Sequence, residues 1–305
     1  MAKTLIVILG ATASGKTKIS VRLACELNGE IISADSRQVY RGLDIGTGKD
    51  LKEYVIDGRQ VPHYMIDVVN PEAEFNLFEF QTRFYEIYSR LVMNRVLSVL
   101  VGGTGLYLES ILLNYQLPPA LPDPQLRKEL QQKSIPDLRK DLLSLKINLH
   151  NKTDIEDKDR LIRAIEIELA RGRQRLEEMN KRPVVDAAVF GIHWERSLLR
   201  RRITERLKQR LNEGMIEEVK ALQASGLSWE RLYSLGLEYR YISQYLLGEI
   251  SYENMFEQLN TSIHQFAKRQ ETWFRRMERK GITVNWINGD NYNMLKESVM
   301  RYLND

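Results

Sequence analysis

The sequence predicts an α/β protein in which a parallel sheet carries a helical insertion. Short apolar runs alternate along the chain with longer amphipathic segments, which is the order of strands and helices in such a sheet. A glycine-rich loop joins the first apolar run to the first helix-like segment, and a proline-rich stretch later introduces a charged region without strand-like runs. Because ligands of parallel sheets bind at the carboxyl ends of the strands, we expect the functional residues there.

Several apolar segments are predicted to form the strands of the sheet. The first of them has the pattern of a fully buried strand. The predicted strands are Thr4–Leu9, Glu30–Ser33, His63–Val69, Leu97–Val101, Val184–Trp194 and Ile282–Ile287.

Helices are predicted between these strands. The first spans Lys16–Leu27 and is followed by Asn28-Gly29, a common way for a helix to end. A second helix places Phe80, Phe84, Ile87 and Leu91 along one face. Further helices are predicted over Thr104–Asn114 and, after the last but one strand, over 196–280.

The organisation changes where four of the eight prolines fall within seven residues, at Pro118, Pro119, Pro122 and Pro124. Such a stretch forms a semi-rigid connection. The residues that follow, Asp123–Arg182, are charged and have a helical pattern. We therefore predict a catalytic α/β core formed by residues 1–117 and 184–305, with residues 118–183 as a helical insertion domain.

Composition restricts the class of protein. The chain of 305 residues has no stretch of roughly 18 apolar residues that could span a bilayer, which predicts a cytoplasmic protein without a membrane partner. Its one cysteine excludes an intramolecular disulfide. The net charge is only +4, but Lys158–Arg210 contains 15 Lys and Arg against 8 Asp and Glu. Such a run forms either a solvated helix face or a footprint for a phosphate backbone, and composition does not decide between them.

A phosphate-binding loop follows the first strand. Gly10-Ala11-Thr12-Ala13-Ser14-Gly15-Lys16-Thr17 matches the pattern G-x-x-x-x-G-K-[ST], and it lies between a strand and a helix as the pattern requires. The backbone N–H groups and the helix N-terminus would face an anion, Lys16 would add a charge, and the Thr17 hydroxyl would bind Mg²⁺. The loop alone predicts a nucleotide-dependent kinase or hydrolase.

The position of the nearest acidic residues argues against that default. Nucleotide-hydrolysing proteins usually carry a Mg²⁺-binding acid at the end of an apolar strand, yet Leu97–Val101 is followed by Gly102-Gly103-Thr104. Asp35 instead follows the second strand. A carboxylate beside a phosphate loop can act as a general base or help to hold a metal, and it can equally cap the turn that follows.

Several motifs together resemble the tRNA dimethylallyltransferase (IPP transferase) family across nearly the whole chain. The family's order and spacing are kept in the phosphate loop and in Pro62-His63 with Ile66-Asp67 and Asn70-Pro71. The other matching segments are Asp-Ser-Arg-Gln-Val-Tyr at 35–40, Leu-Asp-Ile-Gly-Thr at 43–47, Val-Gly-Gly-Thr-Gly-Leu-Tyr at 101–107 and Ala-Lys-Arg-Gln-Glu-Thr-Trp-Phe-Arg at 267–275.

The resemblance implies a P-loop NTPase-like fold whose loop binds the pyrophosphate of dimethylallyl pyrophosphate, with Mg²⁺ near Thr17. Asp35 would accept a proton from the exocyclic N6 amine of an adenosine 3′ of the tRNA anticodon, assisted by Thr104 and Lys16. Ser36, Arg37 and Gln38, with Asp35 and Thr104, would hold the target base. The pyrophosphate contacts would come from Gly10, Ala11, Thr12, Ala13, Ser14, Gly15, Lys16, Thr17 and Arg240.

The insertion is similar to the part of the family that binds the tRNA anticodon stem-loop. Asp-Pro-Gln-Leu-Arg at 123–127 and Asp-Arg-Leu-Ile-Arg-Ala-Ile-Glu at 159–166 carry that likeness. It implies tRNA contacts from Arg127, Asp159, Arg160 and Arg163. The enzyme is expected to act as a monomer.

The sequence departs from the family pattern in three places, and these departures keep other functions open. Gly48 and Asp50 stand where Ala and Pro are usual, the segment before Lys158 is short, and Leu235–Arg240 replaces a motif with glycine at position 238. The alternatives are a P-loop small-molecule kinase, an isopentenyltransferase acting on free adenine nucleotide, and a diverged tRNA-binding paralogue without activity.

Overall fold

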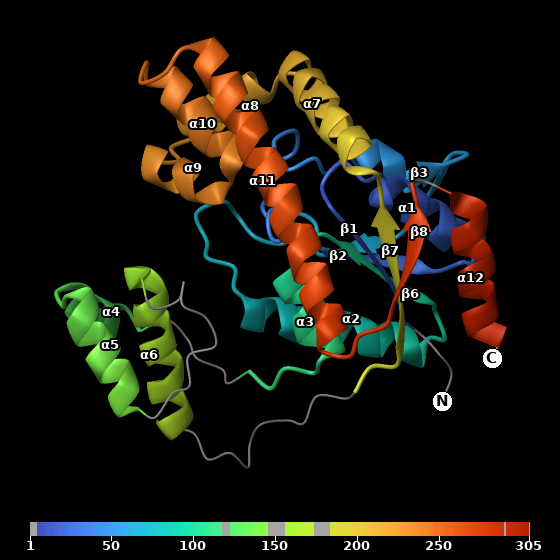
Figure 1. Cartoon of the computed structure of the whole chain (residues 1–305), viewed down its shortest axis with the longest axis horizontal. Coiled ribbons are helices and arrows are strands. Elements are labelled where there is room, and N and C mark those ends of the chain that lie inside the picture. The colour runs from blue at the N-terminus through green and yellow to red at the C-terminus, as the bar shows by residue number, and fades with distance from the viewer. Residues whose placement is uncertain (1–4, 118–122, 146–155, 174–183, 290, 305) are drawn as a thin grey trace. The chain divides into compact units, whose positions relative to one another are not determined.

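The computed structural model describes residues 5–117, 123–145, 156–173, 184–289 and 291–304. These residues form two compact units. One unit is made of Met1–Asn114 and Val184–Asp305, and the other of Tyr115–Pro183. Figure 1 labels the helices and most of the strands.

A six-stranded sheet forms the centre of the larger unit, and every strand pair in it is parallel. The strand order is β5-β2-β6-β1-β7-β8. All six residues of β1 are buried, because β6 and β7 flank it and helices cover both of its faces. The predicted α/β class is confirmed. The strands are β1 Leu5–Gly10, β2 Glu30–Ala34, β5 His63–Tyr64, β6 Ser98–Gly102, β7 Ala187–His193 and β8 Val284–Asn288.

Alternate residues of β1 point into two different cores, as the two-residue period of a strand dictates. Leu5, Val7 and Leu9 pack in one cluster with residues of α2 (Leu77–Met93) and α3 (Gly105–Leu112). Ile6 and Ile8 pack in the other with residues of α1 (Lys16–Glu26) and α12 (Tyr292–Asn304). The sheet is therefore the middle of three layers (Figure 1).

A helical layer covers the carboxyl ends of β1 and β2. Its own core includes Leu199, Ile242 and Leu259, and it packs on Ala11 of the loop after β1 and Val39 of the loop after β2. This layer makes the sheet's carboxyl edge an enclosed space. Its helices are α7 Arg196–Asn212, α8 Met215–Ala224, α9 Trp229–Leu235, α10 Leu237–Leu246 and α11 Tyr252–Arg279.

The smaller unit contains three helices in its described part, α4 Pro124–Gln131, α5 Ile135–Ser144 and α6 Lys158–Arg173. They share a core that includes Leu130, Leu138, Leu142, Leu161 and Ile165. Asp123 caps α4 by accepting hydrogen bonds from the N–H groups of the second and third residues of the helix. The predicted helical character of this region is present in the described residues.

Four local features differ from the sequence prediction. The strand expected over His63–Val69 ends at Tyr64, because Met65 and Asp67 have φ of 68° and 56°, which an extended strand does not allow. A hairpin of β3 (Val55–Ile56) and β4 (Arg59–Gln60) was not predicted. A 3₁₀ turn over Leu51–Tyr54 precedes it, and α12 was not predicted either. Within the described ranges no helix is long and apolar enough to cross a membrane.

Candidate active site

One cavity of about 380 Å³ lies between the carboxyl edge of the sheet and the helical layer, entirely within the larger unit. Three loops that are distant in sequence meet in its wall. Thr12, Lys16 and Thr17 come from the loop after β1, Asp35 from the loop after β2, and Thr104 from the loop after β6. The phosphate loop and the predicted general base therefore face one enclosed space.

The loop after β1 has the shape of an anion cradle. Gly15 has φ of 82°, in the left-handed region that favours glycine, and α1 begins at the next residue. The first N–H groups of α1 have no preceding carbonyls of the helix to bind, so they are left for a ligand. Two side chains that do not line the cavity support the loop through hydrogen bonds to its carbonyls. Trp194 Nε1 donates to the Ser14 carbonyl at 2.9 Å, and Arg202 Nε donates to the Ala13 carbonyl at 2.9 Å.

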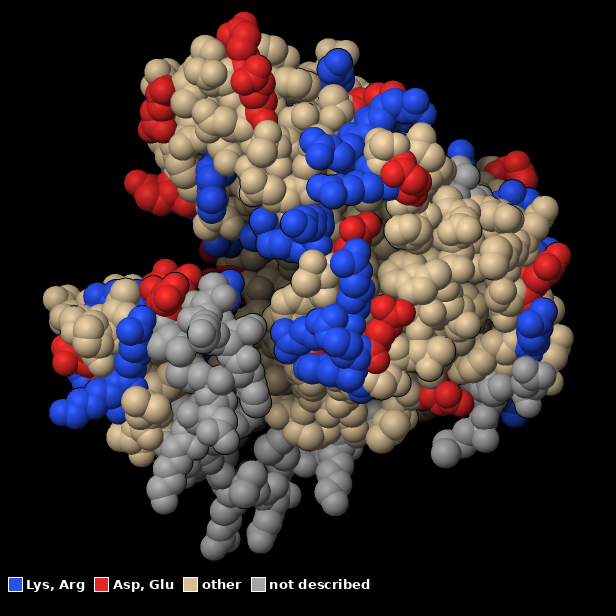
Figure 2. All heavy atoms as spheres, in the orientation of Figure 1, with Lys and Arg blue, Asp and Glu red and all other residues tan. Residues whose placement is uncertain are grey.

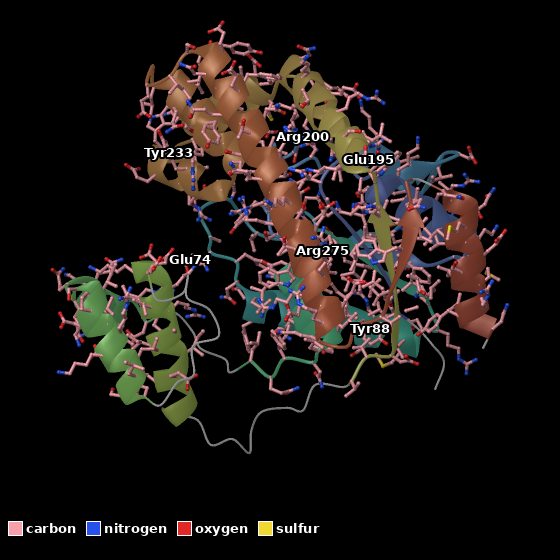
Figure 3. The ribbon with its side chains drawn as sticks, in the orientation of Figure 1. Glu74, Tyr88, Glu195, Arg200, Tyr233 and Arg275 are labelled. Atoms are coloured by element: carbon pink, nitrogen blue, oxygen red, sulfur yellow. The ribbon has the colours of Figure 1, made fainter. Side chains whose placement is uncertain are left out.

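The nine residues predicted to bind pyrophosphate divide into two groups. The side chains or backbone of Thr12, Lys16, Thr17 and Arg240 line the cavity. The remaining five shape the loop and do not line this cavity; they are Gly10, Ala11, Ala13, Ser14 and Gly15. Arg240 lies at an exposed end of the wall, where its Nε donates to the Tyr233 carbonyl at 3.4 Å. Tyr233 is labelled in Figure 3.

Lys16 has an unusual electrostatic environment. Its Nζ donates to the Ala11 carbonyl at 3.3 Å. Burial lowers the pKa of Lys16 from 10.5 to about 8; the carboxylate of Asp35 opposes this shift, and the guanidinium groups of Arg206 and Arg210 add to it. Several positive charges therefore share the wall of the pocket, which is the arrangement expected around the position of an anionic ligand.

Asp35 caps the turn that follows it with one carboxylate oxygen. Its Oδ1 caps the following turn by accepting hydrogen bonds from the N–H groups of Arg37 at 2.8 Å and Gln38 at 3.4 Å. Among the described residues no hydrogen bond engages Oδ2. One carboxylate oxygen thus fixes the orientation of the group, and the other remains to accept a proton.

Thr104 ties the loop after β6 to the loop after β2. Its Oγ1 accepts a hydrogen bond from the Ser36 N–H at 3.0 Å, and its own N–H donates to the Ala34 carbonyl at 3.2 Å. The neighbouring Gly102 lies so close to β2 that a Cβ would overlap the Ala34 carbonyl oxygen. The close approach of the two strands therefore excludes an acidic side chain at the end of β6.

Of the five residues predicted to hold the target base, Ser36, Arg37 and Gln38 also line the cavity, but they differ in what else they do. Gln38 is committed at both ends, because Ser33 Oγ donates to its Oε1 at 3.2 Å and its Nε2 donates to the Gly48 carbonyl at 2.9 Å. Gln38 thereby holds the loop over 46–50 in place. Arg37 is exposed and Ser36 is half-buried, so these two side chains are accessible to a ligand.

Five further residues around the cavity were not predicted. Gln270, Arg206, Arg210 and Glu238 line it. Glu218 lies behind its wall and accepts hydrogen bonds from the N–H groups of residues 44, 45 and 46 and from the hydroxyl of Tyr239, the last at 2.7 Å. A sequence signal existed for the arginines, which are four residues apart and so share one face of α7, within the basic run noted above.

In the smaller unit, the predicted tRNA-binding arginines have intramolecular partners. Buried Glu166 accepts from Arg127 Nε at 2.7 Å and from Arg163 Nη1 at 3.0 Å, which joins α4 to α6. Arg160 and Asp159 are exposed, and Arg160 Nε lies 3.7 Å from Asp157 Oδ2. Arg127 and Arg163 therefore stabilise the unit through their ion pairs with Glu166.

Comparison with known proteins places the chain in one family. The IPP transferase family model matches residues 38–277, and an isopentenyl transferase model matches residues 3–67. The chain is 52% identical over 299 residues to tRNA dimethylallyltransferase 1 of Syntrophus aciditrophicus, covering 98% of both chains. It is 50% identical over 283 residues to tRNA dimethylallyltransferase 2 of Bacteroides fragilis, covering 93% of this chain and 92% of the relative.

Solved structures agree with these relatives. The tRNA isopentenylpyrophosphate transferase of Bacillus halodurans superimposes with a TM-score of 0.70 at 30% identity, covering 99% of this chain and 97% of that one. A eukaryotic dimethylallyltransferase acting on tRNA shares the fold, with a TM-score of 0.76 at 22% identity over 96% of this chain and 75% of that one. These matches support a prenyltransferase and not the kinase or the inactive paralogue. The chain belongs to the tRNA dimethylallyltransferase (IPP transferase) family.

Proposed function

We propose that this enzyme transfers the dimethylallyl group of dimethylallyl pyrophosphate to the exocyclic N6 amine of the adenosine 3′ of the anticodon in tRNA. The observation that carries the proposal is the shared cavity of the phosphate loop and Asp35. A leaving group and a proton acceptor are both required for this reaction, because an exocyclic amine is a weak nucleophile and pyrophosphate must depart with its charge neutralised.

The phosphate loop is the proposed site of the donor. Thr12, Lys16 and Thr17 would bind the pyrophosphate with side chains and with the N–H groups at the start of α1. The lowered pKa of Lys16, about 8, is explained by its burial among other cations, and a pyrophosphate would supply the missing negative charge. Arg240 would reach the donor only from the exposed end of the cavity.

Magnesium is the proposed metal ion. The Thr17 hydroxyl is a hard oxygen donor in the wall of the cavity, and Mg²⁺ usually keeps several waters and completes its shell with substrate phosphates. Among the described residues, no group of three or more His, Cys, Asp or Glu could hold a metal ion, which fits an ion that arrives with its phosphate ligand. When bound, Mg²⁺ would neutralise charge on the pyrophosphate.

Asp35 is the proposed general base. Oδ2 would accept a proton from N6 as the amine nitrogen bonds to the allylic carbon and the carbon–oxygen bond to pyrophosphate breaks. Oδ1 would keep the carboxylate oriented through its hydrogen bonds with the turn at Arg37 and Gln38. Thr104, which holds Ser36, would fix the distance between the base-binding loop and the end of β6.

The acceptor adenosine must leave its stack to enter an enclosed cavity, which costs less in an anticodon loop than in a duplex. The exposed surface offers sites for the surrounding phosphates. Lys and Arg side chains gather over α11 in Figure 2, where the exposed basic residues are Lys268, Arg269, Arg275 and Arg279. The insertion unit would add contacts from Asp159, Arg160 and the neighbouring arginines. Because one chain supplies the whole site, we propose that the enzyme acts as a monomer.

The test is a transfer assay with labelled dimethylallyl pyrophosphate and Mg²⁺. Unmodified tRNA, AMP and ATP are offered separately as acceptors. Label is expected in tRNA alone, at the adenosine beside the anticodon. Label in AMP or ATP would indicate an isopentenyltransferase of free nucleotides, and transfer to none of the three would contradict the proposed reaction.

A further inference from the structure

Arg210 on α7 is a buried guanidinium with an unused donor. Only 9% of the residue is exposed, and its Nη2 is buried without a hydrogen-bond partner among the described residues. The nearest carboxylate oxygen, Asp50 Oδ2, lies 3.9 Å away, beyond hydrogen-bond range. Leaving a buried charged donor unpaired is costly, so a guanidinium of this kind that lines a cavity is suited to bind a ligand atom.

The donor lies on the phosphate side of the active site. Arg210 lines the main cavity together with Lys16, and it also lines a small adjoining recess with Thr12 and Ala13 of the phosphate loop. It is close enough to lower the pKa of Lys16. Its own pKa falls from 12.5 to about 10, mainly through burial and then through Arg206, while Asp50 and Glu238 oppose the shift.

The residues around this guanidinium leave space for it and balance its charge. Gly48 has φ of 62°, and a Cβ at that position would overlap Arg210 Nη2 and crowd Arg206 Nη2. Asp50 forms an ion pair with Arg206. Gly48 and Asp50, on one loop, and Glu238, on α10, therefore meet around one side chain.

We propose that Arg210 is a pyrophosphate-binding residue, whose guanidinium occupies the space that a side chain at Gly48 would fill, donates to a phosphate oxygen of the substrate, and is balanced in charge by Asp50 and Glu238. This inference rests on the proposed function and adds to it a donor outside the phosphate loop. Arg206 would be held by Asp50, and Arg210 would be left to bind the ligand. Glu238 offsets the charge of Arg210 in the absence of ligand, and the same carboxylate repels the phosphate when it binds.

The test is calorimetric titration of the full-length protein with inorganic pyrophosphate in the presence of Mg²⁺. Arg210→Met keeps the length of the side chain without its donors and should raise the Kd about 10- to 100-fold, the usual effect of losing a hydrogen bond to a charged group. Arg201→Met is the matched control, because Arg201 is exposed on the same helix and pairs only with Glu205. Its Kd should stay within about twofold of wild type.

Two further variants separate binding from folding. Glu238→Gln removes the competing charge and should bind pyrophosphate more tightly than wild type. Arg210→Met with Glu238→Gln leaves no unbalanced charge, so it should keep the melting temperature of the wild type and still bind weakly. A Kd in this double variant equal to that of Glu238→Gln alone would overturn the assignment of Arg210. Absence of pyrophosphate binding by the wild-type protein would instead overturn the proposed donor site as well.

Discussion

Gln270 on α11 accepts a hydrogen bond at its Oε1 from the backbone N–H of Thr12 in the phosphate loop, at 2.8 Å. Its Nε2 donates to the Gly103 carbonyl at 2.9 Å. One buried amide therefore links the loop after β1, the loop after β6 and the longest helix of the helical layer. The last turns of α11 thereby set the separation between the phosphate loop and Thr104, which flank the cavity.

Gln270→Leu should disturb this alignment without changing the chemistry of the site. The substitution leaves the Thr12 N–H and the Gly103 carbonyl without their partner, which costs about 1–3 kcal/mol each at a buried position. We expect a lower free energy of unfolding and a KM for dimethylallyl pyrophosphate raised by about tenfold, corresponding to about 1.4 kcal/mol. Urea unfolding and steady-state kinetics measure the two effects. Gln265→Leu, at an exposed position of the same helix, is the control and should change neither.

Asp35→Asn and Asp35→Ala should separate catalysis from local structure. An asparagine oxygen can still accept the hydrogen bonds from Arg37 and Gln38, but the amide does not take up the proton of the amine. We expect the single-turnover rate to fall about 100- to 10,000-fold in Asp35→Asn, with the Kd for tRNA within a few fold of wild type. Asp35→Ala should lose the rate and some stability. Wild-type rates in Asp35→Asn would remove Asp35 from proton transfer.

Much of the fold follows from local patterns. The uniformly apolar Leu5–Gly10 and the amphipathic face with Phe80 and Phe84 identify a buried strand and a covering helix, and both are present. The hairpin of β3 and β4 also had a sequence signal, because Asp-Gly is a typical two-residue hairpin turn. Asp57 and Gly58 have the positive φ values, 50° and 77°, that such a turn requires. The end of β5 had none, because the left-handed Met65 and Asp67 depend on tertiary contacts.

The candidate site was predictable where the chemistry lies in a short motif. The phosphate loop and Asp35 are read from consecutive residues. Gln270 and Glu218 were not predictable as site residues, because their roles come from hydrogen bonds to loops 258 and 173 positions away. Arg210 is a similar case. Its burial is decided by the packing of α7 within the helical layer, and a basic run in sequence does not reveal which arginine faces inward.

The pKa of Lys16 predicts how pyrophosphate binding depends on pH. Between pH 7 and pH 9 the free enzyme loses the proton of Lys16, because its pKa is about 8, so the lysine contribution to the affinity for Mg²⁺-pyrophosphate should weaken. Lys16→Arg stays charged over this range and serves as the reference. Titration of the pyrophosphate itself is common to both proteins. The ratio of the two Kd values should therefore shift in favour of Lys16→Arg as the pH rises, and a constant ratio would contradict the prediction.

The lowered pKa of Lys16 has the opposite effect on folding stability, whose Lys16 contribution improves as the pH rises. Because the pKa of Lys16 is about 8 in the folded protein and 10.5 in the unfolded chain, the unfolded chain binds more protons between these values. Lys16 therefore penalises folding at pH below 8, and the penalty decreases as the pH rises from 8 to 10.5. Thermal unfolding of Lys16→Met should lack this component, and its melting temperature at pH 7 should exceed that of wild type.

Salt dependence of tRNA binding should distinguish the arginines of the insertion unit. Arg160 is exposed on α6, whereas Arg127 and Arg163 are bound to buried Glu166. We expect Arg160→Met to reduce the slope of log K against log salt by about one unit, as loss of one phosphate contact does, with no loss of stability. Arg127→Met should destabilise the unit, because it leaves a buried carboxylate with one partner fewer. Lys140→Met, an exposed change of equal charge on α5, is the control. An equal slope for Arg160→Met and wild type would indicate that this basic run is a solvated helix face and not a phosphate-binding surface.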